Sequence, residues 1–180
     1  MSEGGAEATI IDGINNSGTV IRFEQGENSD CLLNGFTVTN GNASHDAGGI
    51  YCLYSSPTIM NCIVVANYAP GEGGGLYFYN SSPLILNCSI INNNGDGGGG
   101  GIYVASGSPD MYDSIVCGNS PEQIYPSDQF PDDNGNSIFN DCDLPPIFGA
   151  CCLPKGSCYE SEIEADCLAA GGVYGGDNSN

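Results

Sequence analysis

The chain has 180 residues, 40% of them hydrophobic, which suits one domain with a small appendage and argues against disorder despite 28 glycines. Its 22 acidic residues outnumber two basic ones, and the resulting formal charge of −20 excludes binding to nucleic acid or to an anionic membrane surface. Ten cysteines without zinc-type spacing favour disulfides in an oxidising compartment.

The sequence does not suggest a membrane-spanning protein. No apolar run approaches the roughly 20 residues that a membrane-spanning helix needs. The opening MSEGGAEATI has neither the basic nor the apolar part of a signal peptide. We therefore expect a piece of a longer secreted chain that is located outside the cell or on its surface.

One phrase returns at a fixed interval along the middle of the chain. It reads GGIYCLYSSPTIMNC over 48–62, GGLYFYNSSPLILNC over 74–88 and GGIYVASGSPDMYDS over 100–114. Its tyrosines, prolines and asparagines recur every 26 residues. A period of this length is typical of a repeat architecture.

Within each copy, apolar residues occupy every second position of short runs that are separated by Gly, Ser-Pro or Asn. This alternation predicts short strands, and three strands with three turns make one coil of a solenoid. Equivalent inward residues then stack in these columns: Ile50, Leu76 and Ile102; Val64, Ile90 and Val116; Cys62, Cys88 and Ser114. We expect Cys62 and Cys88 to remain thiols, because parallel side-chain vectors suit disulfide geometry poorly.

The second strand of each coil ends in a residue that tolerates a left-handed backbone. Asn61 and Asn87 hold this place in two coils, and Asp113 holds it in the third. Stacked side chains here can bond to one another along the solenoid. We interpret the column as a structural asparagine ladder, and Asp113 as a substitution at its end in preference to a catalytic acid.

The pattern GGxY…SSPxIxNCxI…N resembles that of secreted right-handed parallel β-helix repeat proteins, some related to polymorphic outer-membrane proteins. Residues 10–41 resemble the lead-in coil of that family; a shift of 26 lays Leu33, Phe36 and Val38 on Ile59, Cys62 and Val64. The resemblance covers roughly residues 9–142 and implies an all-β, right-handed parallel β-helix with three strands per 26-residue coil. It implies no single function, because this scaffold carries lyases, hydrolases, adhesins and fibres.

After Asn119 the period is lost, and three prolines follow within a few residues. We predict an irregular cap from about residue 120, which completes a solenoid domain over 1–147 and covers the core with these residues: Ile124, Phe130, Ile138 and Phe139. Cys117 aligns with outward-facing residues of earlier coils, so a disulfide with Cys142 is expected to tie the cap down.

Residues 148–180 are rich in cysteine, lack the 26-residue repeat and are expected to form a separate mini-module held by disulfides. Four further disulfide candidates lie in it: Cys151, Cys152, Cys158 and Cys167. A short helix is expected near Glu160 to Ala170. The segment resembles a small Cys-rich segment that follows such domains in secreted bacterial, planctomycete-like proteins. It is too small for a core of its own.

The sequence offers few groups for catalysis. Its nitrogen bases are Arg22, His45 and Lys155, which lie in three different parts of the expected fold. Most carboxylates fall in turns and tails, where solvation gives them ordinary acidity, and glycoside hydrolysis needs two carboxylates in one site. Serine or cysteine triads lack a suitable histidine. We expect no enzyme, with a polysaccharide lyase or glycosidase as the alternative.

Carboxylates at equivalent turn positions are candidate Ca²⁺ ligands, since this ion prefers oxygen. One set is Asp46, Glu72 and Asp96, which fall in corresponding loops of successive coils. A second set has a partial calcium-loop spacing: Asp132, Asn134, Asn136 and Asp143. The alternative is a solvated acidic surface without bound metal, and no cofactor is required.

An outward column of Tyr51, Tyr77 and Tyr103 is the candidate binding face. Aromatic columns stack on sugar rings or on a partner, but they also stabilise neighbouring strands. The leading hypothesis is a non-enzymatic, secreted structural or adhesive module that associates weakly through its solenoid ends. The alternative is a carbohydrate-binding or lyase-like domain that uses the tyrosines to contact a polysaccharide or cell surface.

Overall fold

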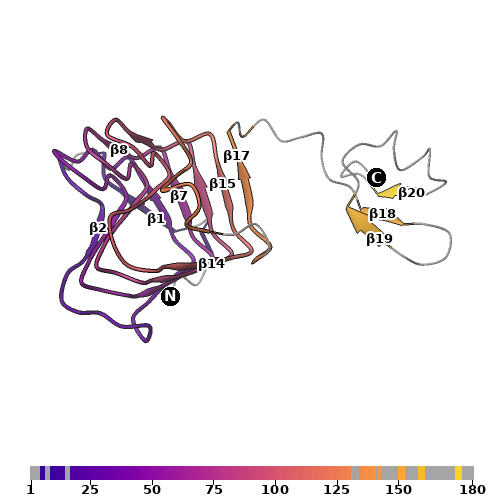
Figure 1. The fold of residues 1–180 in the computed structure, drawn as a ribbon, viewed down its shortest axis with the longest axis horizontal. Coiled ribbons are helices and arrows are strands. Elements are labelled where there is room, and N and C mark those ends of the chain that lie inside the picture. Colours follow the sequence, from indigo (N-terminus) through magenta and orange to yellow (C-terminus); the bar gives the residue numbers. More distant parts are fainter. Residues whose placement is uncertain are drawn as a thin grey trace. The chain divides into compact units, whose positions relative to one another are not determined.

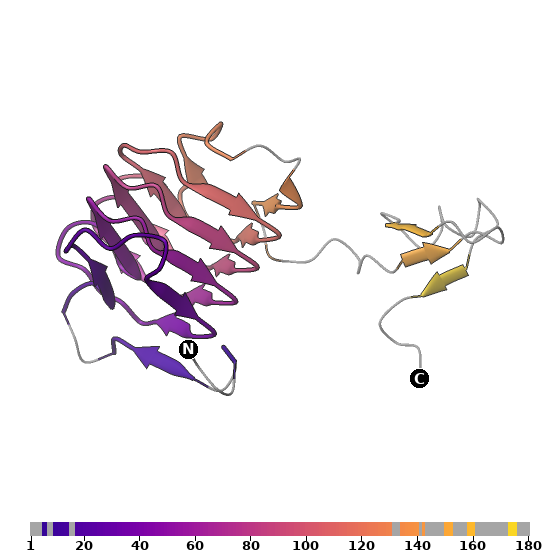
Figure 2. The same ribbon diagram turned by 90° about the horizontal axis from the view of Figure 1, so that it is seen from below.

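The computed structural model describes residues 5–6, 9–14, 17–130, 134–140, 142, 150–152, 158–160 and 173–175. The chain forms two compact units, Met1–Cys142 and Asp143–Asn180, which are described separately. The first unit is a parallel β-solenoid whose coils stack in sequence order, from indigo to orange in Figures 1 and 2. Among the described residues, no helix is long and apolar enough to cross a membrane.

Three parallel sheets run along the solenoid, as the period predicted. The first sheet contains β2 (Ile21–Phe23), β5 (Ile50–Leu53), β9 (Leu76–Tyr79), β13 (Ile102–Val104) and β16 (Ile124–Tyr125). The second contains β3 (Leu32–Asn34), β6 (Thr58–Met60), β10 (Leu84–Leu86) and β14 (Asp110–Tyr112). The third contains β1 (Ile10–Asp12), β4 (Thr37–Thr39), β7 (Ile63–Val65), β11 (Ser89–Ile91), β15 (Ile115–Cys117) and β17 (Ser137–Phe139). A two-stranded sheet pairs β8 (Tyr68–Ala69) with β12 (Asn94–Gly95).

The register confirms the 26-residue coil. Ile50 pairs with Leu76 and Leu76 with Ile102, while the third sheet aligns Val64 with Ile90 and Ile90 with Val116 in the same way. All six of these inward side chains are fully buried. The core is therefore a set of apolar columns in which each residue packs on its own equivalent one coil away.

The inward cysteine column is also as predicted. Cys62 and Cys88 are buried free thiols. Each Sγ donates to the carbonyl two residues earlier, Cys62 to Met60 at 3.1 Å and Cys88 to Leu86 at 3.2 Å. The hydroxyl of Ser114 makes the equivalent bond in the next coil. These thiols therefore act as small polar core residues.

The turn between the second and third sheets has the expected left-handed residues. Asn61, Asn87 and Asp113 have φ angles of 51°, 49° and 49°. The side-chain amide of Asn61 donates to Asn34 at 2.9 Å, and that of Asn87 donates to Asn61 at 2.7 Å. This ladder lies at the solenoid surface.

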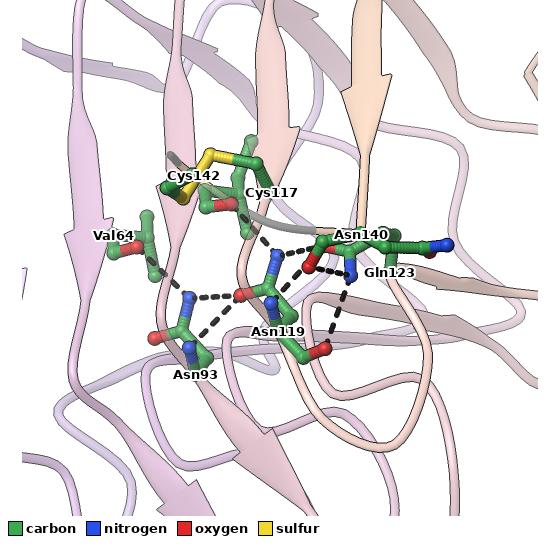
Figure 3. Close-up of a disulfide and its surroundings, with 8 residues drawn as sticks. Val64, Asn93, Cys117, Asn119, Gln123, Asn140 and Cys142 are labelled. Carbon is green, nitrogen blue, oxygen red and sulfur yellow. Dashed lines mark hydrogen bonds between the residues drawn. A yellow bond between two sulfur atoms is a disulfide. The ribbon is translucent and has the colours of Figure 1, made fainter. Parts of the chain in front are cut away.

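A second asparagine ladder is buried, and it was not predicted (Figure 3). Oδ1 of Asn93 accepts hydrogen bonds from both the backbone N–H and the side-chain amide of Asn67, each at 3.0 Å. Oδ1 of Asn119 accepts the same two bonds from Asn93, and Oε1 of Gln123 accepts them from Asn119. Each ladder amide also donates to the carbonyl of a core strand, as Asn93 does to Val64 at 3.0 Å.

The buried ladder explains the second glycine of the Gly-Gly pair that opens each repeat. A Cβ on Gly75 would lie 3.0 Å from Nδ2 of Asn93 and 2.6 Å from the carbonyl oxygen of Gly101. A Cβ on Gly49 would meet Asn67 and the next coil at similar distances. A side chain at these positions would force the ladder and the coils apart, so the phrase needs glycine there.

The segment after residue 119 was expected to form an irregular cap, and the structure extends two of the three sheets into it. β16 and β17 continue the first and third sheets, and Ile102 pairs with Ile124, only 22 residues later. The backbone bonds persist, as in Ile102 N–H to the carbonyl of Gln123. The second sheet ends at β14, and Phe130 buries its ring against the core. The chain therefore ends the solenoid with a shortened coil.

A disulfide joins Cys117 to Cys142, as the outward position of Cys117 predicted (Figure 3). It closes the shortened coil that contains β16 and β17. Ile124 is buried, Ile138 packs partly against the core, and Phe139 is half-buried.

The second unit contains an antiparallel sheet with β18 (Ala150–Cys152) between β19 (Cys158–Glu160) and β20 (Val173–Gly175). Cys151, Cys152 and Cys158 lie in these strands, but their side chains are outside the described part of the structure. Cys167 and residues 161–170 of the expected helix are also outside it, whereas Glu160 belongs to a strand.

We predict that Asn93→Ala lowers the free energy of unfolding by about 3 kcal/mol, because it removes the acceptor of the buried Asn67 backbone N–H and two further buried hydrogen bonds, one from the Asn67 amide and one to the carbonyl of Val64. Urea unfolding followed by circular dichroism measures the change. Asn42→Ala, at an exposed position, is the control and should stay within about 0.5 kcal/mol. Equal effects of the two substitutions would contradict a stabilising role for the ladder.

Candidate functional site

The outer face of the first sheet carries a continuous column of four tyrosines. Side chains alternate across a strand, so the residue after the inward Ile50, Leu76, Ile102 or Ile124 points outward. Ring centroids are 5.3 Å apart for Tyr51 and Tyr77, 5.5 Å for Tyr77 and Tyr103, and 5.1 Å for Tyr103 and Tyr125. The rings are within 17° of parallel.

The fourth ring, Tyr125, was missed because its spacing from Tyr103 is 22 residues. The repeated Ile-Tyr pair was the available signal, since Ile124-Tyr125 matches Ile102-Tyr103 in order and in alternation. The column therefore runs through the shortened last coil.

Arg22 covers the first ring of the column. It lies in β2 in register with Tyr51, and its guanidinium carbon is 4.5 Å from the ring centroid. Nε and Nη2 donate to the carboxylate of Glu24, and Nη1 donates to Thr19 at 3.4 Å. These bonds use the edge of the flat guanidinium, while one of its faces lies on Tyr51.

Stacking uses most of the ring faces in the column. Tyr77 has a neighbouring ring on each side and is only 7% exposed, whereas Tyr125 at the end of the column is 48% exposed. A sugar ring needs a free aromatic face to stack upon. The three tyrosines predicted as a binding face thus offer mainly edges and hydroxyl groups.

A second aromatic pair lies beside the column. Tyr54 and Tyr79 meet edge to face, with centroids 5.8 Å apart and an interplanar angle of 78°. Their exposed fractions are 63% and 40%. Tyr54, which follows β5, and Tyr79, at the end of β9, therefore present more free aromatic surface than Tyr77 in the column.

The environment of the column disfavours ionised phenols. Burial raises the pKa of Tyr77 to about 12, and the nearby carboxylates of Asp46 and Glu72 add to the rise. Burial also raises the pKa of Tyr51 and of Tyr103. Tyr51, Tyr77 and Tyr103 are therefore neutral at physiological pH.

Asp46 and Asp96, two residues of the predicted acidic column, accept hydrogen bonds from different donors. Oδ1 of Asp46 accepts a hydrogen bond from the backbone N–H of Glu72 at 3.0 Å. Asp96 accepts a hydrogen bond from the hydroxyl of Tyr68 at 2.7 Å. In the next coil, the residue that pairs with Glu72 in a parallel β-bridge is Gly98 and not Asp96. Within the described part of the chain, no three acidic, histidine or cysteine residues form a group that could hold a metal ion.

The partial calcium-loop set is only partly described. Oδ1 of Asn136 accepts from the N–H of Ser114 at 3.1 Å, and its amide donates to the carbonyl of Met111 at 2.8 Å. Asn136 therefore closes the turn as Ser114 does one coil earlier. The carbonyl of Asn134 accepts from the backbone of Asp113. Asp132 and Asp143 lie outside the described residues.

The solenoid ends are the other candidate site. Among the described strands, β2 and β3 each have a parallel neighbour on one side, as do β14, β16 and β17 at the opposite end. A strand with one neighbour presents backbone N–H and C=O groups that can pair with a further strand. The two ends therefore offer edges of the same parallel type.

We predict that raising the pH above about 10 destabilises the solenoid, because a phenol whose pKa is raised on folding ionises more readily in the unfolded chain. The contribution is intact below the unfolded value and is lost as the pH rises through about 12 for Tyr77. Urea unfolding measured between about pH 9 and about pH 12 tests this. Tyr77→Phe should reduce the fall; an unchanged fall would assign it to other groups.

The family model described as "Right handed beta helix region" matches residues 4–152, which is well over half of the chain. Searches of curated proteins and of solved structures gave no significant match. The match agrees with the parallel sheets and stacked coils described above. The chain therefore belongs to the right-handed β-helix family.

Proposed function

We propose that this chain is a non-enzymatic structural module of a secreted or cell-surface protein, and that it associates end to end through its solenoid. The observation that carries the proposal is that, among the described strands, the last one at each end of a sheet has a neighbour on one side. β2 and β3 at one end, and β16 and β17 at the other, can each accept one more parallel strand.

The contacts of the polar residues support a structural role. Among the described residues, every buried side-chain nitrogen or oxygen has a hydrogen-bond partner within the fold. Several of these bonds join equivalent positions of adjacent coils, as in the buried ladder of Asn67, Asn93 and Asn119. These side chains serve the scaffold, which fits a protein that acts by shape and surface.

The basic groups considered for catalysis have other surroundings. Arg22 is engaged by Tyr51 and Glu24, and the ring of the exposed His45 lies beside the hydroxyl of Ser44 at 3.1 Å. Lys155 is outside the described residues. No pairing of Arg22 or His45 with a buried carboxylate is present in the described part, which favours a structural role over a lyase mechanism.

Polysaccharide binding is the second candidate function, and the exposed rings of Tyr54 and Tyr79 favour it. Their edge-to-face contact leaves aromatic surface at the rim of the first sheet. The longer column offers less, since its inner ring faces are stacked on one another.

Head-to-tail contact is heterologous, so repeated association extends a fibre instead of closing a dimer. Each copy carries a charge of −20, and this repulsion opposes association at low salt. Added salt shortens the Debye length from about 30 Å at 0.01 M to about 10 Å at 0.1 M and weakens the repulsion.

We therefore predict weak, concentration-dependent association in sedimentation velocity that increases with NaCl. CaCl₂ at matched ionic strength is the control, and an additional increase there would indicate specific cation binding. A monomeric profile at high protein concentration in both salts would contradict end-to-end assembly.

A further inference from the structure

The three sheets of the solenoid differ in length, and this decides how two copies can meet. The third sheet has six strands, the first has five and the second has four. β2, β3 and β4 form the first full coil, and β1 lies one row before β4. At the other end, β16 and β17 extend past β14 by one row. The ends are therefore stepped.

The steps prevent simple continuation of all three sheets. If β2 of a second copy pairs with β16 of the first, β4 of the second copy comes level with the strand position beside β17. That edge of β4 is already occupied by its own β1. The third sheet can continue across the junction only when β1 has left β4.

The first sheet has matching side chains at its two ends. At one end, a face of the Arg22 guanidinium lies on Tyr51, and the side chain is 48% exposed. At the other end, one face of Tyr125 lies on Tyr103, and the residue is also 48% exposed. Placing β2 one strand spacing beyond β16 brings the free face of Arg22 over the free face of Tyr125.

We infer that a second copy of this chain docks with β2 against β16, so that its Arg22 stacks on Tyr125, and that β1 blocks this contact until it is displaced. This inference rests on the proposed end-to-end assembly. The new contact repeats the Arg22–Tyr51 contact within each copy. A guanidinium between two aromatic faces is a favourable cation–π arrangement, and Arg22 is the one arginine of the chain.

The second sheet does not obstruct the junction. β3 of the incoming copy would lie two rows beyond β14, since the last coil has no strand in this sheet. Phe130, five residues after β16, packs against the core.

β1, the strand that occupies the outer edge of β4, is short and largely exposed. It has three residues, and Ile10 is 59% exposed. Within β1, the Asp12 side chain adds one bond to the neighbouring coil, because Oδ1 accepts from the amide of Asn40 at 2.8 Å. Just before β1, the carbonyl of Ala6 accepts from the hydroxyl of Thr37 at 2.7 Å. Displacement of β1 exchanges its pairing with β4 for pairing of β4 with β17 of the neighbouring copy.

The test is sedimentation velocity of the full chain at the salt concentration where the wild type associates, with circular dichroism to show that each variant is folded. Tyr125→Ala and Arg22→Gln should each raise the association Kd about three- to tenfold, because each removes the stacked pair. Tyr125→Phe keeps the ring and should change Kd less than about twofold. Tyr79→Ala, at an exposed tyrosine outside the column, is the matched control.

Asp12→Ala tests the block separately. It removes the acceptor that anchors β1 and should lower the association Kd, whereas a purely structural role for Asp12 would leave Kd unchanged. The double variant Arg22→Gln with Tyr125→Ala should raise the association Kd no more than either single variant does, since both substitutions remove the same contact.

The outcomes separate this inference from the proposed function. Association that is insensitive to Arg22, Tyr125 and Asp12 would overturn the docking mode and leave end-to-end assembly standing. A monomeric profile for every protein, including Asp12→Ala, would overturn both.

Discussion

Buried asparagines constrain the geometry of the regular coils, because Asn67 and Asn93 each find their acceptor one coil away. The carbonyl oxygen of the Asn93 side chain serves two donors of Asn67, and Asn119 does the same for Asn93. An unpaired amide in this position would lose its hydrogen bonds to water without replacement. The requirement fixes both the 26-residue period and the glycines that let the coils approach.

The buried ladder begins and ends near the two ends of the solenoid. Gly41 donates its N–H to Asn67 at one end, and Gln123 completes the ladder at the other with its longer side chain. Gln123 also reaches the carbonyls of Asn119 and Asn140, so it joins the shortened last coil to the regular ones (Figure 3). The same coil brings Tyr125 into the outer column and leaves the second sheet one strand short.

Much of this architecture could be predicted from the sequence, because the strands are short and their equivalents recur at one interval. The inward columns and the left-handed Asn61 and Asn87 follow from alternation and turn chemistry. The last coil could not be predicted from the period, since its 22-residue spacing breaks the repeat. Arg22 was missed as a member of the column because 29 residues separate it from Tyr51 in the register. The buried ladder shares the period, but polarity alone suggests exposed positions for asparagine.

Native-state hydrogen exchange tests the central claim most directly, since the backbone amides of Asn67 and Asn93 donate to ladder side chains inside the core. If the ladder holds the coils together, these amides exchange only through global unfolding of the solenoid, and their exchange free energies fall with denaturant along the global unfolding line. Exchange of either amide through a local opening that is insensitive to denaturant would contradict the account.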